Sequence, residues 1–333
     1  MKILYISCHQ VLEYDEIKLL HDLGHEVFST GTYAYPLFRP GMIRPGIPQL
    51  THYPELERLA STIVSSGYAI PQELIDWADT IIFMHLPEAL EKNWSKMSGK
   101  RVVFRSIGQM LAHQERLIAT LREQGLQVVR YSPQEKQIPD YAGADATIRF
   151  YKDPQEYYGY TGERAEVINF SQSIIQRRNE CHYAEIMELM RGFPGKIYGT
   201  GNENINPQMN GGEVDYPTFC ATLRTSRAFI YTGTWPAPYT LSFIEAMMTG
   251  IPIVALGKQH AELDRGIHFY EVPSIIQDGV NGFVSDDLSQ LRVKIGQLLA
   301  DVDYAKKIGQ AGRKRAIELF GYATILEQWR AFL

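Results

Sequence analysis

The segment with the clearest chemical potential runs from residue 228 to residue 254 and reads AFIYTGTWPAPYTLSFIEAMMTGIPIV. The apolar runs at its two ends are typical of buried strands, and Pro236 and Pro238 forbid a helix early in the loop between them. Gly250, followed by Pro252, is a usual helix end. A short helix is therefore expected between the strands, and its first backbone N–H groups belong to Thr240, Leu241 and Ser242.

This helix would begin at the carboxyl end of a strand in a parallel sheet. Phosphate-bearing ligands bind at such a point, since the unpaired N–H groups and the helix dipole favour negative charge. Thr240 or Ser242 is expected to cap the helix. One carboxylate, Glu245, lies just inside it. The segment by itself thus predicts a phosphate site with one acidic residue nearby.

The remainder of the chain alternates strands with helices. Strands are predicted at 2–7, 26–29, 80–84, 101–105 and 127–131, and again at 166–170 and 196–198 before the segment described above. A loop from 31 to 54, rich in Pro, Gly, Tyr and Arg, is long enough to be functional or mobile. The stretch 151–162 breaks the alternation and is the candidate linker. This pattern predicts an α/β protein with two Rossmann-like, doubly wound parallel sheets.

Composition sets the broad class. The chain has 333 residues, of which 45% are hydrophobic and 21% charged, as in a soluble protein of two domains. No apolar run approaches the roughly 18 residues that span a bilayer, and the chain opens with a strand rather than a signal peptide. The scattered cysteines Cys8, Cys181 and Cys220 indicate no disulfide framework. We therefore expect a cytoplasmic protein. Its net charge of −5 argues against a nucleic-acid partner unless a local basic face exists.

Two motifs follow one another in the second half of the chain: FIEAMMTGIPIV at 243–254 and PSIIQDGVNGFV at 273–284. In this order and spacing they resemble the donor-binding domain of retaining GT-B fold glycosyltransferases, most closely glycosyltransferase family four. The likeness covers roughly 196–320. It implies an acceptor-side domain at 1–160 and a nucleotide-sugar-binding domain at 161–318, facing a cleft. It also implies a C-terminal helix at 319–333 that crosses back to the first domain.

The chain departs from the family's E-x7-E motif at one position. In the family the first glutamate contacts the sugar and the second holds the nucleotide ribose. Here Ala237 stands at the first position and Glu245 at the second. The family's phosphate-binding loop is also altered, because the sequence SQSIIQRR at 171–178 follows the strand. This loop is similar to that of bacteriophage DNA base glucosyltransferases, which also lack the first glutamate.

The resemblance assigns roles to the donor residues. Glu245 would accept hydrogen bonds from both ribose hydroxyls, although an acid near a helix N-terminus is also favoured by the dipole alone. Arg177 and Arg178 would bind the diphosphate, since a guanidinium contacts two phosphate oxygens at once; otherwise they are a solvated surface pair. Backbone recognition of the base would involve the loops that contain Gly199, Gly201 and Val214.

The first half of the chain supplies the remaining candidates. His85, at the end of a predicted strand, resembles the family's histidine that faces the donor sugar and is the expected catalytic residue, although a lone histidine there is more often structural. His9 and Gln10 lie in the first strand-to-helix loop and would contact acceptor or diphosphate. No metal site is expected: the acidic pairs at 286–287 and 301–303 stand where helices begin, and no Cys/His spacing indicates zinc.

The sequence therefore predicts a retaining, metal-independent glycosyltransferase without a cofactor. A UDP-sugar is the expected donor and a hydroxyl-bearing molecule the acceptor. One alternative is a phage-type enzyme acting on a modified base in DNA, with a basic face that includes Lys92, Lys96, Lys100, Arg101 and Arg105. A second is a non-catalytic nucleotide-binding protein on a GT-B scaffold, which Ala237 makes conceivable. A third, a sugar-nucleotide epimerase of the same fold, would need carboxylates that the sequence does not identify. Oligomeric state is left open.

Overall fold

A computed structural model describes residues 1–31, 53–63, 68–262 and 269–333. The chain forms two compact units, Met1–Phe150 with Ile325–Leu333, and Tyr151–Thr324. Most of the loop predicted at 31–54 lies outside the described residues. None of the described helices combines the length and apolar character needed to cross a membrane.

The first unit is built on a six-stranded sheet in the order β2-β1-β3-β4-β5-β6, and every neighbouring pair is parallel. Its strands are β1 (Lys2–Ile6), β2 (Glu26–Ser29), β3 (Thr80–Met84), β4 (Arg101–Arg105), β5 (Gln127–Arg130) and β6 (Ala146–Thr147). Its helices are α1 (Gln10–Asp22), α2 (Pro54–Ala60), α3 (Gln72–Trp77), α4 (Pro87–Asn93) and α5 (Ala112–Arg122), with the 3-10 helices η3 (Trp94–Met97) and η4 (Pro133–Gln137). Helix α1 begins directly after His9, whose side chain accepts a hydrogen bond from Leu12 N and caps the helix.

The second unit repeats this plan with the strand order β12-β11-β10-β7-β8-β9, again parallel throughout. The strands are β7 (Arg164–Phe170), β8 (Gly195–Tyr198), β9 (Asn210–Gly212), β10 (Ser226–Tyr231), β11 (Ile253–Leu256) and β12 (Phe283–Ser285). The helices are α6 (Tyr183–Met190), α7 (Tyr216–Thr225), α8 (Leu241–Thr249), α9 (Lys258–Glu262), α10 (Val272–Ile275), α11 (Leu288–Ala300) and α12 (Val302–Phe320). The prediction of two doubly wound parallel sheets is confirmed.

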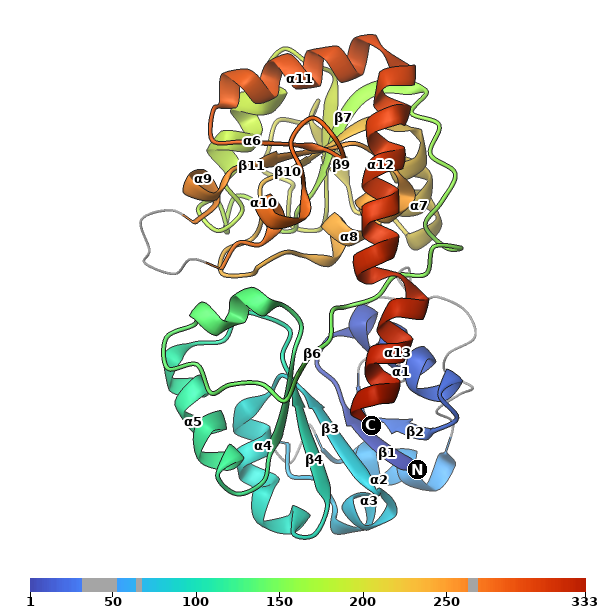
Figure 1. Cartoon of the computed structure of the whole chain (residues 1–333), viewed down its shortest axis with the longest axis vertical. Helices are drawn as coiled ribbons and strands as arrows, with labels where there is room; N and C mark the ends of the chain where they lie inside the picture. Colours follow the sequence, from blue (N-terminus) through green and yellow to red (C-terminus); the bar gives the residue numbers. More distant parts are fainter. Residues whose placement is uncertain (32–52, 64–67, 263–268) are drawn as a thin grey trace. The chain divides into compact units, whose positions relative to one another are not determined.

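Packing explains why the central strands read as unbroken apolar runs. All six residues of β10 are buried, as expected of a parallel strand covered on both faces. Helix α6 packs with α11, whereas α8 packs with α7 and α12 (Figure 1). Gly250 ends α8 in the left-handed conformation, at a φ of 93°. Beside it, a Cβ at Gly309 of α12 would clash with the Gly250 carbonyl oxygen. Glycine at this position thus allows α12 to cross α8 at close range.

The final helix, α13 (Tyr322–Phe332), carries the chain from the second unit to the first. Within the first unit, the side chains of Ile325 and Trp329 are fully buried. Arg101 of β4 donates to the carbonyl oxygens of Phe332 and Leu333, each at 2.7 Å. These contacts fix the end of α13 against the first unit's sheet.

Candidate functional site

Each sheet has one point at which its strand order reverses. In the second unit the chain passes from β7 outward to β8 and β9, then returns to the other side of β7 as β10. In the first unit β2 and β3 flank β1 in the same manner. Ligands of doubly wound sheets bind outside the carboxyl ends of the strands at such points. The loops after β7 and β10, and those after β1 and β3, are therefore the places where functional residues are expected.

Helix α8 begins directly after the loop that follows β10. Thr240 occupies its N-cap position, but no side chain caps the helix, so the prediction of a capping hydroxyl is wrong. The Thr240 hydroxyl is instead hydrogen-bonded to the Ser242 hydroxyl, with 3.0 Å between the two oxygens. The Tyr231 hydroxyl accepts a hydrogen bond from Thr240 N at 2.9 Å and so fixes the start of the helix. The backbone N–H groups of the first turn, where Leu241 and Ser242 are half-buried, are not capped by a side chain and therefore suit an anion.

The loop after β7 carries the two candidate phosphate-binding arginines. Arg177 is half-buried and Arg178 is exposed. Neither guanidinium has a hydrogen bond or ion pair with any residue that the structure describes. The backbone ties this loop to the one that precedes α8, since Trp235 N donates to Glu180 O and Thr232 Oγ1 to Cys181 O, both at 2.8 Å. The structure thus brings the arginine loop and the α8 loop together at one strand reversal.

A third loop, after β8, contains two of the glycines proposed for base recognition. Gly199 has a φ of 136°, and a Cβ at this position would clash with the carbonyl oxygen of Ser171, so the close approach to the arginine loop requires glycine there. Gly201 is also left-handed, at a φ of 74°. The buried side chain of Asn202, which the sequence did not single out, accepts from Ile174 N at 2.9 Å and donates to Ser171 O at 2.7 Å.

The last base-recognition candidate, Val214, is half-buried just beyond the short strand β9. Gly199 N donates to Gly212 O at 2.9 Å and joins the end of β8 to the end of β9. The loops after four adjacent strands of the second unit are consequently connected side by side. They form one continuous backbone rim at the carboxyl edge of the sheet.

Glu245 is nearly buried and is held by two partners that the sequence did not reveal. Its side chain is 9% exposed, and Oε1 lies 2.8 Å from the Nζ of the fully buried Lys152. The Tyr157 hydroxyl donates to the same oxygen at 3.1 Å. Both partners belong to the predicted linker 151–162, which therefore packs against α8 instead of running freely. Little in the sequence hints at these contacts, since the lysine directly follows Tyr151 in an otherwise ordinary connecting stretch.

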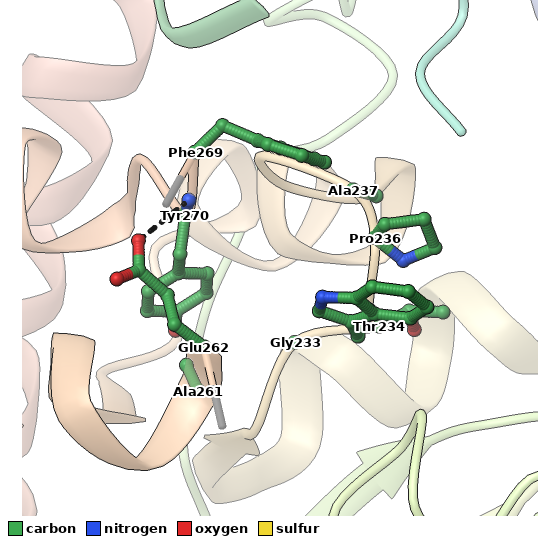
Figure 2. Close-up of a pocket in the computed structure, with 9 residues that line it drawn as sticks. Gly233, Thr234, Pro236, Ala237, Ala261, Glu262, Phe269 and Tyr270 are labelled. Atoms are coloured by element: carbon green, nitrogen blue, oxygen red, sulfur yellow. Dashed lines mark hydrogen bonds between the residues drawn. The ribbon is translucent and has the colours of Figure 1, made fainter. Parts of the chain in front are cut away.

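Next to the α8 loop the surface has a shallow pocket that is open to solvent (Figure 2). Its lining comes from the loop after β10, from the end of α9 and from the segment before α10: Gly233, Thr234, Trp235, Pro236, Ala237, Ala261, Glu262, Phe269 and Tyr270. The carboxylate of Glu262 accepts a hydrogen bond from Tyr270 N at 3.3 Å and lies 3.8 Å from Lys258 Nζ. The pocket thus sets one nearly buried carboxylate among aromatic walls, beside the small side chain of Ala237.

The three candidates in the first unit lie at its own strand reversal. The Cys8 thiol donates to Met84 O at 3.4 Å, which joins the loops that contain His9 and His85. His9 caps α1, and Gln10 is the half-buried first residue of that helix. His85 adopts a left-handed φ of 57°, and its buried Nδ1 has no hydrogen-bond partner among the described residues. A polar atom without a partner and an unusual backbone conformation are both typical of functional positions.

Burial of the His85 imidazole favours its neutral form. Burial lowers the pKa of His85, and the nearby Glu88 carboxylate opposes this effect in part. The neutral ring can donate from one nitrogen and accept at the other. It could therefore hydrogen-bond to a sugar hydroxyl, whereas a charged imidazolium could only donate.

The acidic pairs serve as helix caps, as predicted. Asp287 accepts from the backbone N–H groups at the start of α11, and Asp301 does the same for α12. Asp286 accepts from His260 N at 3.0 Å. Over the described ranges, no group of three or more potential ligands could hold a metal ion.

Of the residues proposed for a basic face, Lys92 and Lys96 are exposed, whereas Arg105 cannot contribute. Arg105 is fully buried and pairs with Glu16 at 2.7 Å, and Arg101 binds the end of α13. The ammonium groups of Lys96 and Lys100 donate to backbone carbonyls. The sequence could not show this, because the partners are distant in the chain.

Comparison with solved structures identifies proteins of the same architecture. No protein-family model matches the chain, and no curated protein sequence matches it either. HepE from Anabaena, solved in complex with UDP and glucose, matches with a TM-score of 0.70 and 16% identity over 100% of this chain and 99% of that one. Sucrose-phosphate synthase from Thermosynechococcus elongatus matches with a TM-score of 0.67 and 14% identity, over 100% and 98%. The chain has the GT-B fold.

A third similar structure is a glycosyltransferase from Rickettsia africae, with a TM-score of 0.67 and 14% identity over 99% of this chain and 97% of that one. The predicted GT-B fold class is thereby confirmed. At such low identities the likeness concerns the fold alone, and one fold can host unrelated activities. Any assignment of function has to come from the site.

Proposed function

We propose that this GT-B protein is a glycosyltransferase that moves a sugar from a nucleotide-diphosphate sugar, expected to be a UDP-sugar, to a hydroxyl-bearing acceptor. One observation carries the proposal. At the strand reversal of the second unit, the loop that ends in an uncapped helix N-terminus is hydrogen-bonded to the loop that carries two arginines without ion-pair partners among the described residues. Fixed positive charge of this kind stabilises a departing diphosphate as negative charge develops on it.

Nucleotide binding follows the same geometry. The diphosphate would lie at the N-terminus of α8, with Arg177 and Arg178 over its oxygens. Glu245 would receive the ribose, and the base would lie along the backbone near Gly199, Gly201 and Val214. HepE has been solved with UDP-glucose as well as with UDP and glucose, which supports a uridine nucleotide as the first ligand to test.

The pocket beside Ala237 is the proposed place for the transferred sugar. A carboxylate accepts hydrogen bonds from sugar hydroxyls, and an aromatic ring covers the apolar face of a pyranose. Glu262 and Trp235 supply these two groups. In this proposal Glu262 contributes the carboxylate that position 237 lacks, and His85 stays the proposed catalytic residue, acting as a hydrogen-bonding group.

Two finer features of the reaction are proposals as well. The likeness to glycosyltransferase family four favours retention of the anomeric configuration. The helix N-terminus and the arginines supply enough charge for the leaving group to depart without a metal ion. Turnover should then be unchanged in the presence of a chelator, and NMR of the first product should show the donor's anomeric configuration. An inverted product would refute retention.

A thermal-shift screen across UDP-, GDP-, ADP- and CDP-sugars tests the proposal. A ligand at about 100 times its dissociation constant adds roughly 2.7 kcal/mol of stability, which is measurable. The matched control is the double variant Arg177→Gln, Arg178→Gln, which should lose the shift. Glu245→Ala is a poor control, because it would leave the buried Lys152 ammonium without its carboxylate. Binding without any transfer or hydrolysis would favour a non-catalytic nucleotide-binding protein, and no shift with any donor would refute the proposal.

A further inference from the structure

Lys152 lies just after the chain enters the second unit. Its backbone N donates to Phe320 O at 3.0 Å, and it forms a parallel bridge with Gly321 at the end of α12. The neighbouring Tyr151 ring packs edge-on against Tyr322, with centroids 5.8 Å apart. The backbone of Lys152 is thus fixed by the second segment that connects the two units. Its side chain, fully buried, points from there to α8.

The contacts of that side chain leave half of one carboxylate open. Lys152 Nζ lies 2.8 Å from Glu245 Oε1, and the Tyr157 hydroxyl donates to the same atom at 3.1 Å. A carboxylate offers about four lone-pair sites on its two oxygens. No described residue donates to Glu245 Oε2, and the side chain keeps 9% of its surface exposed. Lys152 and Tyr157 therefore hold the carboxylate by one oxygen and leave the other as an acceptor.

The place of Glu245 on α8 suits a ribose. It lies four residues after Leu241, about 6 Å along the helix axis from the proposed diphosphate position. A buried ion pair gives little net stability over apolar side chains of the same volume. Stability alone therefore does not explain a lysine that is fully buried here.

We propose that Lys152, assisted by Tyr157, is a positioning residue that orients Glu245 so that Oε2 accepts the ribose hydroxyls of the bound nucleotide. This inference rests on the proposed function. It adds two residues that act through a third and do not themselves contact the ligand.

The test measures recognition of the ribose hydroxyls rather than affinity alone. UDP, 2′-deoxy-UDP and 3′-deoxy-UDP are titrated calorimetrically into the full chain, its Lys152→Met and Tyr157→Phe variants, and the control Arg227→Met. Arg227 is a nearly buried basic residue of the same unit that donates to the backbone carbonyls of Gly162, Leu298 and Leu299. The wild type is expected to prefer UDP over each deoxy form by on the order of tenfold, the effect of one hydrogen bond to a charged group.

Lys152→Met should reduce this preference to near unity, because the carboxylate is no longer held. Tyr157→Phe, which removes a single hydroxyl and keeps the ring, should reduce it less and remains informative if Lys152→Met fails to fold. Arg227→Met should keep the full preference, whatever its stability. A merely structural lysine would weaken all three ligands equally, and that result, or an unchanged preference in Tyr157→Phe and Lys152→Met alike, overturns the inference.

Failure of the proposed function has a different signature. If UDP does not bind the wild type at all, the UDP-dependent function is refuted and this inference with it. If UDP binds but the wild type does not distinguish it from the deoxy forms, the ribose role of Glu245 and its positioning by Lys152 are wrong, while donor binding stands.

Discussion

Replacement of Arg177 by Gln should weaken UDP binding far more than the same change at Arg178. The sequence could not separate the two neighbours, but the structure can, because Arg177 is half-buried at the strand reversal and Arg178 is exposed. A hydrogen bond to a charged group contributes about 1.5–3 kcal/mol where water is partly excluded, or on the order of 10- to 100-fold in affinity. An exposed ion pair contributes about 0.2–1 kcal/mol, or less than about fivefold.

The assay is calorimetric titration with UDP and, in parallel, with uridine. Because the arginines are assigned to the diphosphate, uridine binding should be nearly unchanged in both variants. Arg191→Gln is the matched charge control, since Arg191 belongs to the same unit, has a side chain that is 71% exposed and pairs with Glu188. Added salt should reduce the Arg178 contribution more than that of Arg177. Equal losses for UDP and uridine, or a larger loss at Arg178, would refute the reasoning.

Three further predictions concern the sugar, the histidine and the C-terminal helix. Glu262→Gln should weaken UDP-glucose by about tenfold relative to UDP; parallel losses for both ligands would remove Glu262 from the sugar pocket. The lowered pKa of His85 predicts an NMR titration below the ordinary value of about 6.5 and a kcat that is flat above it. As pH falls through that value, the unfolded chain binds the proton before the folded chain does. The free energy of unfolding should therefore fall more steeply with decreasing pH in the wild type than in His85→Gln; identical slopes would contradict this. Trp329→Ala should cost about 3–5 kcal/mol in urea unfolding, because the ring is fully buried; a cost as small as that of Leu111→Ala, at a 47% exposed position, would show that α13 is not held there.

Much of the fold could be predicted from sequence because its signals are local. The apolar run of β10, the prolines that delay α8, and Gly250 at its end each act within a few residues of where they stand. Alternation of such elements is sufficient to predict two parallel, doubly wound sheets. The order of strands within each sheet is the one usual for doubly wound folds. The points where this order reverses therefore lie beside the site residues that were predicted from sequence.

The partners of those residues were decided only by tertiary structure. Glu245 and Tyr157 are 88 residues apart in the chain, and nothing local to either indicates the contact. Glu262 reaches the pocket beside Ala237 only because β10 and β11 pair and carry their loops to one edge of the sheet. Likewise, Arg105 reads as a surface charge in sequence but is buried against Glu16. Sequence thus determined which elements form and where each one ends, because propensity and patterning are local. Which polar groups meet, and which remain open to a ligand, depends on desolvation and packing between distant segments, and only the folded chain decides it.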